Sequence, residues 1–184
     1  MLPTLDPATG LLPPGRHVCT AAEVEAAFVK DVAFSGSPTR PDLWNEWNAA
    51  LAVLQSAVTV HAAWLGGSFT TSKFDPEDID VTFVINGEDL RQRSPNDQRI
   101  VSLFKGRGQV KSSLGLRIDS YTIPWETYLL GPVFPVHAEY FRARGYWDDW
   151  WQRARQGPKG SPPQPGDAVP RRGYLEVLAS DYPS

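Results

Sequence analysis

The chain has 184 residues, with 18 Lys or Arg against 21 Asp or Glu, so its formal net charge is −3. Hydrophobic residues make up 41% and charged residues 21%, which excludes a disordered acidic tail, a collagen-like repeat and a coiled coil. The length fits one domain that buries a real core. The 17 Pro and 15 Gly exceed average usage, which predicts many turns and at least one irregular tail.

The charge is divided unevenly along the chain. Residues 1–90 carry four basic and 12 acidic side chains, a balance of −8, whereas residues 91–184 carry 14 basic and nine acidic ones, a balance of +5. The densest basic stretch, 91–117, holds seven cationic side chains and a single acidic one, Asp97. Such a stretch is more often a solvated face than a surface for a polyanion, and both interpretations stay open at this point.

The sequence contains no targeting or membrane signal. Cys19 is the only cysteine, so neither an intrachain disulfide nor a cysteine cluster for zinc is expected. The N-terminus lacks the basic start and the unbroken apolar run of a secretory signal. The most apolar region, 49–65, is interrupted by polar residues and is shorter than the roughly 20 residues of a membrane span. We therefore expect a cytoplasmic protein that does not cross a membrane.

The predicted elements alternate between helices and strands. Residues 1–19, rich in Pro and Gly, are expected to form an extended N-terminal arm over the surface. Thr20, with Glu23 three places later, has the capping-box pattern that starts a helix over 21–31. The later elements are, in order, a helix over 41–57, strands over 58–65 and 78–85, a helical stretch over 88–105 broken near Pro95, a strand over 114–123 ended by Pro124, an aromatic helical segment over 137–155 and a strand over 173–178.

These elements predict one domain with short additions at each end. The core is expected to span 20–157, and a Pro-rich connector follows at 158–170. Residues 171–184 then supply a C-terminal strand that packs back on the core. Helices mixed with a few strands are typical of the α+β and α/β classes.

Two acidic residues open the predicted strand 78–85. Asp78 and Asp80 lie two residues apart, so both project from one face, about 6–7 Å apart along the chain. The opposite face carries Ile79, Val81, Phe83 and Ile85. A third carboxylate, Asp119, lies within a later strand, where a charge needs solvent or a partner. Three carboxylates on neighbouring strands predict a two-metal site for Mg²⁺ or Mn²⁺, because hard cations prefer carboxylate and phosphate oxygens.

A glycine-rich turn precedes this acidic pair. Gly66, Gly67 and Ser68 follow a predicted strand and precede a short helical segment, an arrangement in which backbone N–H groups approach an anion closely. We expect these residues to bind phosphate oxygens, with Thr71 and Lys73 as further candidates. An ordinary cap hydrogen bond is the commoner role for Thr71, and a solvated surface position is the commoner one for Lys73.

The segment from the predicted strand 58–65 to Asp80 resembles the active-site signature of the polymerase-β-type nucleotidyltransferases. It contains, in order, a strand, Gly-Ser, nine further residues and then Asp-Ile-Asp. Gly67 and Ser68 match the Gly-Ser pair of that signature, Asp78 and Asp80 its paired acids, and Asp119 its third acid. The resemblance implies an α+β domain, a small mixed sheet flanked by helices. It also implies metal-dependent transfer of a nucleotidyl group from an NTP to an acceptor in RNA, a protein or a small molecule. In that reaction the three acids bind metal, and Asp119 serves the acceptor hydroxyl.

Small members of this superfamily include the minimal nucleotidyltransferases of bacterial toxin–antitoxin and phage-defence loci, which implies such a setting here. Residues 11–17, 64–73 and 171–177 also resemble a family of small uncharacterised bacterial proteins of nucleotidyltransferase type, with no assigned substrate.

Three other functions stay open from the sequence. One is an inactive nucleotidyltransferase fold that serves as a binding module or antitoxin, another is an RNA-binding protein, and the third is a Mg²⁺-dependent phosphohydrolase.

Asp119 also has a structural alternative, an ion pair with Arg117 or Lys111. In the Trp-rich segment 140–155, aromatic residues at helical spacing are more typical of core than of a surface that stacks bases.

Overall fold

The computed structural model describes residues 2–126, 134–158 and 160–179, which build one mixed five-stranded sheet. The strands are β1 (Gly15–Cys19), β2 (Val60–Leu65), β3 (Ile79–Asn86), β4 (Ile118–Trp125) and β5 (Gly173–Leu178). Their order across the sheet is β1-β5-β2-β3-β4. Strand β2 is antiparallel to both of its neighbours, whereas β1 pairs with β5, and β3 with β4, in parallel.

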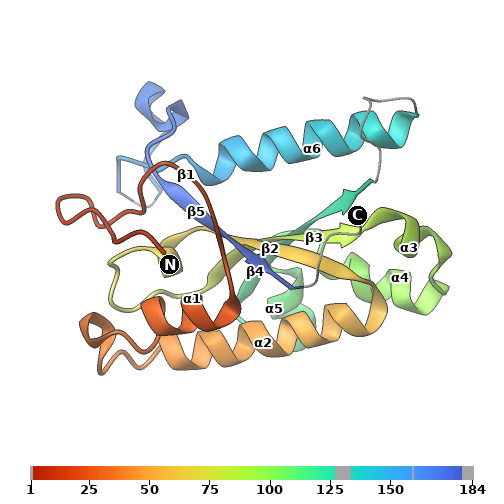
Figure 1. Cartoon of the computed structure of the whole chain (residues 1–184), viewed down its shortest axis with the longest axis horizontal. Coiled ribbons are helices and arrows are strands. Elements are labelled where there is room, and N and C mark those ends of the chain that lie inside the picture. The colour runs from red at the N-terminus through yellow and green to blue at the C-terminus, as the bar shows by residue number, and fades with distance from the viewer. Residues whose placement is uncertain (1, 127–133, 159, 180–184) are drawn as a thin grey trace.

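Helices cover both faces of the sheet, as Figure 1 shows. They are α1 (Ala21–Phe28), α2 (Arg40–Ala57), α3 (Gly87–Gln92), α4 (Pro95–Ser102), α5 (Gln109–Leu114) and α6 (Pro135–Trp151). The larger apolar cluster joins α1, α2, α4 and α5 to one face of the sheet. A second cluster joins α6 to the other face. The protein is therefore an α+β domain, as expected, with α6 on one side and most of the remaining helices on the other.

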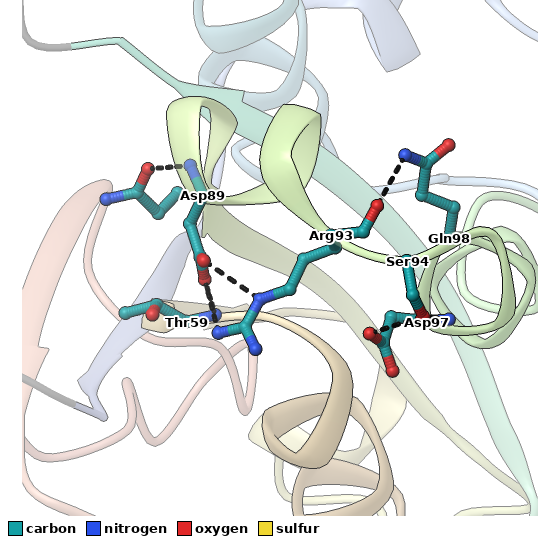
Figure 2. A network of polar contacts seen from close by, with 7 residues as sticks. Thr59, Asp89, Arg93, Ser94, Asp97 and Gln98 are labelled. Atoms are coloured by element: carbon teal, nitrogen blue, oxygen red, sulfur yellow. Dashed lines mark hydrogen bonds and ion pairs between the residues drawn. The ribbon is translucent and has the colours of Figure 1, made fainter.

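Local sequence signals predicted where most of these helices and strands lie. The capping box at Thr20 and Glu23 is present at the start of α1, and Pro41 lies in the first turn of α2. The predicted break near Pro95 separates α3 from α4. Figure 2 shows the polar contacts around this break, where Asp89 binds both the Arg93 guanidinium and the backbone N–H of Thr59. Among the described residues, no helix is long and apolar enough to cross a membrane.

The prediction of a surface arm over residues 1–19 is wrong for residues 15–19. Residues 15–19 form β1, an edge strand paired with β5, and Leu12 is buried in the core. Sequence reasoning missed this strand because its partner lies more than 150 residues further along the chain. The C-terminal strand β5 consequently lies between β1 and β2, inside the sheet rather than against its outside.

The third predicted strand also differs from the structure. Residues 109–114 form α5, and β4 begins only at Ile118 and continues through Pro124 to Trp125. Proline ends a central strand because it lacks the N–H donor, but an edge strand tolerates it. Strand β4 is such an edge, because β3 is its single neighbour among the described strands.

The Arg40 side chain anchors the loop between the glycine-rich turn and β3. Arg40 is fully buried at the start of α2, and its guanidinium lies 3.7 Å from the ring centroid of Phe34. It donates hydrogen bonds of 2.6–3.1 Å to five carbonyl oxygens, those of Phe28, Phe69, Thr71, Lys73 and Phe74. Four of these carbonyls belong to the loop, so one side chain determines the path of the chain toward Asp78.

Replacing Arg40 by Leu is expected to lower the free energy of unfolding by about 3 kcal/mol or more, because it leaves several buried carbonyl groups without donors. Urea unfolding followed by circular dichroism measures the change. Arg99→Leu is the control, because Arg99 is exposed on α4 and its loss is expected to cost no more than about 0.5 kcal/mol. Equal stabilities for the two variants would contradict the anchoring role.

Candidate active site

The predicted acids lie together on the face of the sheet that α6 covers. Ile79, Val81 and Phe83 of β3 belong to the opposite core, so the alternating residues Asp78, Asp80 and Thr82 face α6. Asp80 on β3 and Asp119 on β4 are direct partners in the parallel register of the two strands. Asp78 precedes β3 by one residue. The sequence therefore predicted the correct face, and the strand pairing brings Asp119 beside Asp80.

Asp80 is placed in an environment that opposes its ionisation. The pKa of Asp80 is raised to about 6, mostly by burial and also by the negative charges of Asp78 and Asp119, while Arg107 and Arg172 act in the opposite direction. A cation bound between these carboxylates would remove much of this electrostatic cost.

Asp119 is held by two donors in the structure. Arg107 Nε donates to Asp119 Oδ2 at 2.9 Å, and the backbone N–H of Gly108 donates to Oδ1 at 3.0 Å. The structural alternative for Asp119, an ion pair with a nearby cation, is present, but the partner is Arg107 rather than Arg117, which binds Glu46 at 2.6–2.9 Å. Arg107 itself is 75% exposed, so the ion pair lies at the rim of the site.

The glycine-rich turn packs directly on the acidic pair. Gly67 has φ +63°, and a Cβ at this position would overlap the Asp80 carboxylate, so only glycine fits. The N–H of Gly66 donates to the Asp80 carbonyl at 3.0 Å. A Cβ at Gly66 would overlap the Trp151 ring, so the space beside this residue is filled by α6.

Arg172, which precedes β5, ties the turn to the rest of the sheet. Its buried guanidinium donates to the Gly67 carbonyl at 2.9 Å and to Thr70 Oγ1 at 2.7 Å. Burial lowers the pKa of Arg172 to about 10, so the group stays protonated at neutral pH and places a positive charge near Asp80. The sequence analysis predicted no role for Arg172 itself, because its neighbours in space are far from it along the chain.

The remaining phosphate-binding candidates have structural partners. Thr71 Oγ1 donates to the Ser68 carbonyl at 2.8 Å and accepts from the Lys73 N–H at 3.2 Å, which is the cap role considered for Thr71. Lys73 Nζ lies 3.6 Å from a Glu77 carboxylate oxygen. Ser68 is half-buried at the first position of the short 3₁₀ helix η2 (Ser68–Thr70). A phosphate-binding role for Gly66, Gly67, Ser68, Thr71 and Lys73 stays a prediction.

The basic stretch 91–117 is largely an ion-paired surface. Four of its seven cations pair with carboxylates outside the stretch, through Arg91–Glu126, Arg93–Asp89, Arg107–Asp119 and Arg117–Glu46. Arg107 is the member that contacts a predicted site residue.

The donor chemistry of the site fits Mg²⁺ or Mn²⁺, because carboxylate oxygens are the ligands such cations prefer. Within the described residues, however, no group of three or more His, Cys, Asp or Glu side chains is arranged to hold a metal ion. Both oxygens of Asp119 accept hydrogen bonds, from Arg107 and from Gly108. A cation at Asp119 would therefore compete with Arg107 for this carboxylate.

We expect Asp80→Asn to stabilise the fold at high pH. A carboxyl whose pKa is higher in the folded than in the unfolded state lowers the stability of the fold as the pH rises from about 4 to about 6, and the full cost remains at higher pH. The variant should exceed the wild type by about 2 kcal/mol at pH 8, with no gain at pH 4, in urea unfolding. Glu139→Gln, at an exposed position, should show no such pH dependence, and a gain for Asp80→Asn that is equal at both pH values would contradict the prediction.

Comparison with known proteins identifies a family without an assigned activity. No curated protein and no solved structure matches the chain. Residues 3–177 match the model of a family described as a family of unknown function, DUF6932. Because this match spans nearly the whole chain and all the residues of the candidate site, the protein belongs to the DUF6932 family.

Proposed function

We propose that the protein is a divalent-metal-dependent nucleotidyltransferase. The observation that carries this proposal is the register pairing of Asp80 with Asp119 on adjacent parallel strands, beside a Gly-Ser turn that packs on Asp80. Carboxylates that face one another at a half-buried position are mutually repulsive, and a cation together with a polyphosphate substrate is a chemical reason to place them there. The same arrangement agrees with the resemblance of this segment to the nucleotidyltransferase signature.

In nucleotidyl transfer an acceptor oxygen forms a bond to the α-phosphorus of an NTP, the bond to the β-phosphate oxygen breaks, and pyrophosphate leaves. Asp78, Asp80 and Asp119 would hold Mg²⁺ or Mn²⁺, which when bound supplies neutralisation of phosphate charge. Asp119 is suited to take the acceptor proton, because its ion-pair partner Arg107 is 75% exposed and can turn toward the phosphates. Catalysis of this kind depends mainly on positioning and on charge complementarity.

One observation favours a second candidate function, an inactive nucleotidyltransferase-type fold that binds a ligand without metal. Arg107 already neutralises Asp119 from within the chain, as a bound cation would. In a binding module this ion pair would be permanent, whereas in an enzyme it must open.

The transfer assay uses each α-³²P-labelled NTP with Mg²⁺ or Mn²⁺ and either total RNA or cell lysate as acceptor. We expect label to appear on an acceptor with the wild type and to fall at least about 100-fold with Asp80→Asn. Glu139→Gln should retain wild-type transfer. Release of phosphate without a labelled acceptor would indicate a phosphohydrolase, and nucleotide binding that needs no metal would indicate the binding module. Absence of both transfer and metal-dependent NTP binding would overturn the enzymatic proposal.

Arg107→Gln separates the two candidates further. In the enzyme, removing Arg107 frees Asp119 and deletes a competing positive charge, so Mn²⁺ alone should bind a few-fold, up to about tenfold, more tightly. Titration of Mn²⁺ followed by electron paramagnetic resonance measures this affinity. Arg117→Gln, which disrupts the Glu46 pair instead, should leave the affinity unchanged. If wild type and Arg107→Gln both fail to bind Mn²⁺, the binding-module function is favoured.

A further inference from the structure

The aromatic residues of the last two turns of α6 form two stacked pairs. One pair packs toward the sheet, and the other is largely exposed. Trp147 and Trp151 stack at 5.6 Å between ring centroids, and Trp151 is only 5% exposed, with its Nε1 donating to Thr82 Oγ1 at 3.0 Å. Tyr146 and Trp150 also stack, at 5.9 Å and an interplanar angle of 14°. This second pair is 56% and 47% exposed. The expectation of a core role for the aromatic residues of this segment is therefore correct for Trp151 and wrong for Trp150 and for Phe141, which is 46% exposed.

Ring contacts connect the exposed pair to the candidate active site. Tyr121 on β4 follows Asp119 by two residues, so both side chains are on the same face, about 7 Å apart along the strand. The Tyr121 ring contacts Trp147, with centroids 4.3 Å apart, and Trp147 in turn meets Tyr146 edge-on at 5.1 Å. A continuous series of rings thus leads from Asp119 to the Tyr146–Trp150 pair.

Contacts at the site agree with this proximity. Arg107 Nε donates to Asp119 at 2.9 Å, and the Trp151 ring, which stacks on Trp147, fills the space beside Gly66 of the glycine-rich turn. The rings, the carboxylates and Arg107 therefore border one region.

We propose that the Tyr146–Trp150 pair is a stacking platform for the base of the nucleoside triphosphate. This inference rests on the proposed function and adds to it the place at which the base is recognised. A base stacked on the pair would leave its phosphates on the side of Tyr121, toward the carboxylates and Arg107. Base stacking on aromatic side chains strengthens binding and tolerates different bases, because every base has a π-face.

A single nucleotide fits this surface better than a nucleic-acid strand or an apolar protein segment. The exposed platform consists of one stacked pair, since Trp151 behind it is buried and Trp147 is half-buried, and this area suits one base. Its two rings are nearly parallel and carry polar phenol and indole groups, whereas a docking surface for aliphatic side chains needs a broader apolar area. Arg107, 75% exposed beside Asp119, supplies the positive charge that complements a phosphate group.

Equilibrium binding by calorimetry, with the full chain and Mg²⁺, compares ATP, GTP, CTP and UTP with inorganic tripolyphosphate, which lacks a base. We expect the wild type to bind its preferred NTP about tenfold or more tightly than tripolyphosphate. Trp150→Ala should remove this difference by weakening NTP binding while leaving tripolyphosphate binding unchanged. Trp150→Phe should restore part of it. Phe141→Ala is the matched control, because Phe141 is 46% exposed on the same helix but contacts Tyr140 instead.

The outcomes separate the platform from the proposed function. If the wild type binds NTPs in a Mg²⁺-dependent manner and Trp150→Ala binds them equally well, the platform is wrong and the nucleotidyltransferase proposal stands. If Trp150→Ala weakens binding of a single-stranded oligoribonucleotide but not of NTPs, the pair serves a nucleic-acid strand, and the proposal is again overturned. If the wild type binds neither NTPs nor tripolyphosphate with Mg²⁺ or Mn²⁺, the proposed function fails and the platform fails with it.

Discussion

The buried guanidinium of Arg40 is the interaction on which the geometry of the candidate site depends. The segment between Gly67 and β3 contains little regular structure, so its carbonyl groups need donors from elsewhere in the fold. Arg40 supplies all five of its N–H groups to carbonyl oxygens, and four of these belong to that segment. Burial lowers the pKa of Arg40 to about 10, which still leaves the charge and every donor in place at neutral pH. A neutral side chain of similar size would leave several carbonyls unpaired in the core, at a cost of about 1–3 kcal/mol each.

A second buried arginine, Arg172, performs a related task from the opposite side of the turn. Arg40 holds the loop from α2, and Arg172 holds Gly67 and Thr70 from the start of β5. The turn therefore contacts elements from both ends of the chain, while Gly67 packs on Asp80. Such a frame keeps the carboxylate of Asp80 half-buried near two other acids, despite the repulsion that raises its pKa. Under the proposed function this stored electrostatic cost is what a cation and a polyphosphate would relieve.

The structure explains the uneven distribution of charge along the chain, which the sequence alone did not. Most of the excess cations in 91–117 do not form a free basic face, because they pair with acids of other elements. Glu46 of α2 binds Arg117, and Asp89 of α3 binds Arg93, so the acidic first half of the chain neutralises part of the basic second half. Arg107 differs from these because its partner Asp119 belongs to the candidate site. The region relevant to an anionic ligand is therefore much smaller than the composition indicated.

The sequence by itself determined the local elements and the face on which the candidate acids lie. Capping residues and hydrophobic periodicity act over a few residues, so the start of α1, the extent of α2 and the alternation of β3 were all predictable, including Asp78 and Asp80 opposite an apolar face. Only the tertiary structure decided that residues 15–19 form a strand beside β5, that β4 is an edge that accepts Pro124, and that Arg107 rather than Arg117 binds Asp119. It also decided which indoles are covered and which are exposed on α6. These outcomes depend on contacts between segments distant in the sequence, and the pattern of one segment carries no information about which partner it will meet.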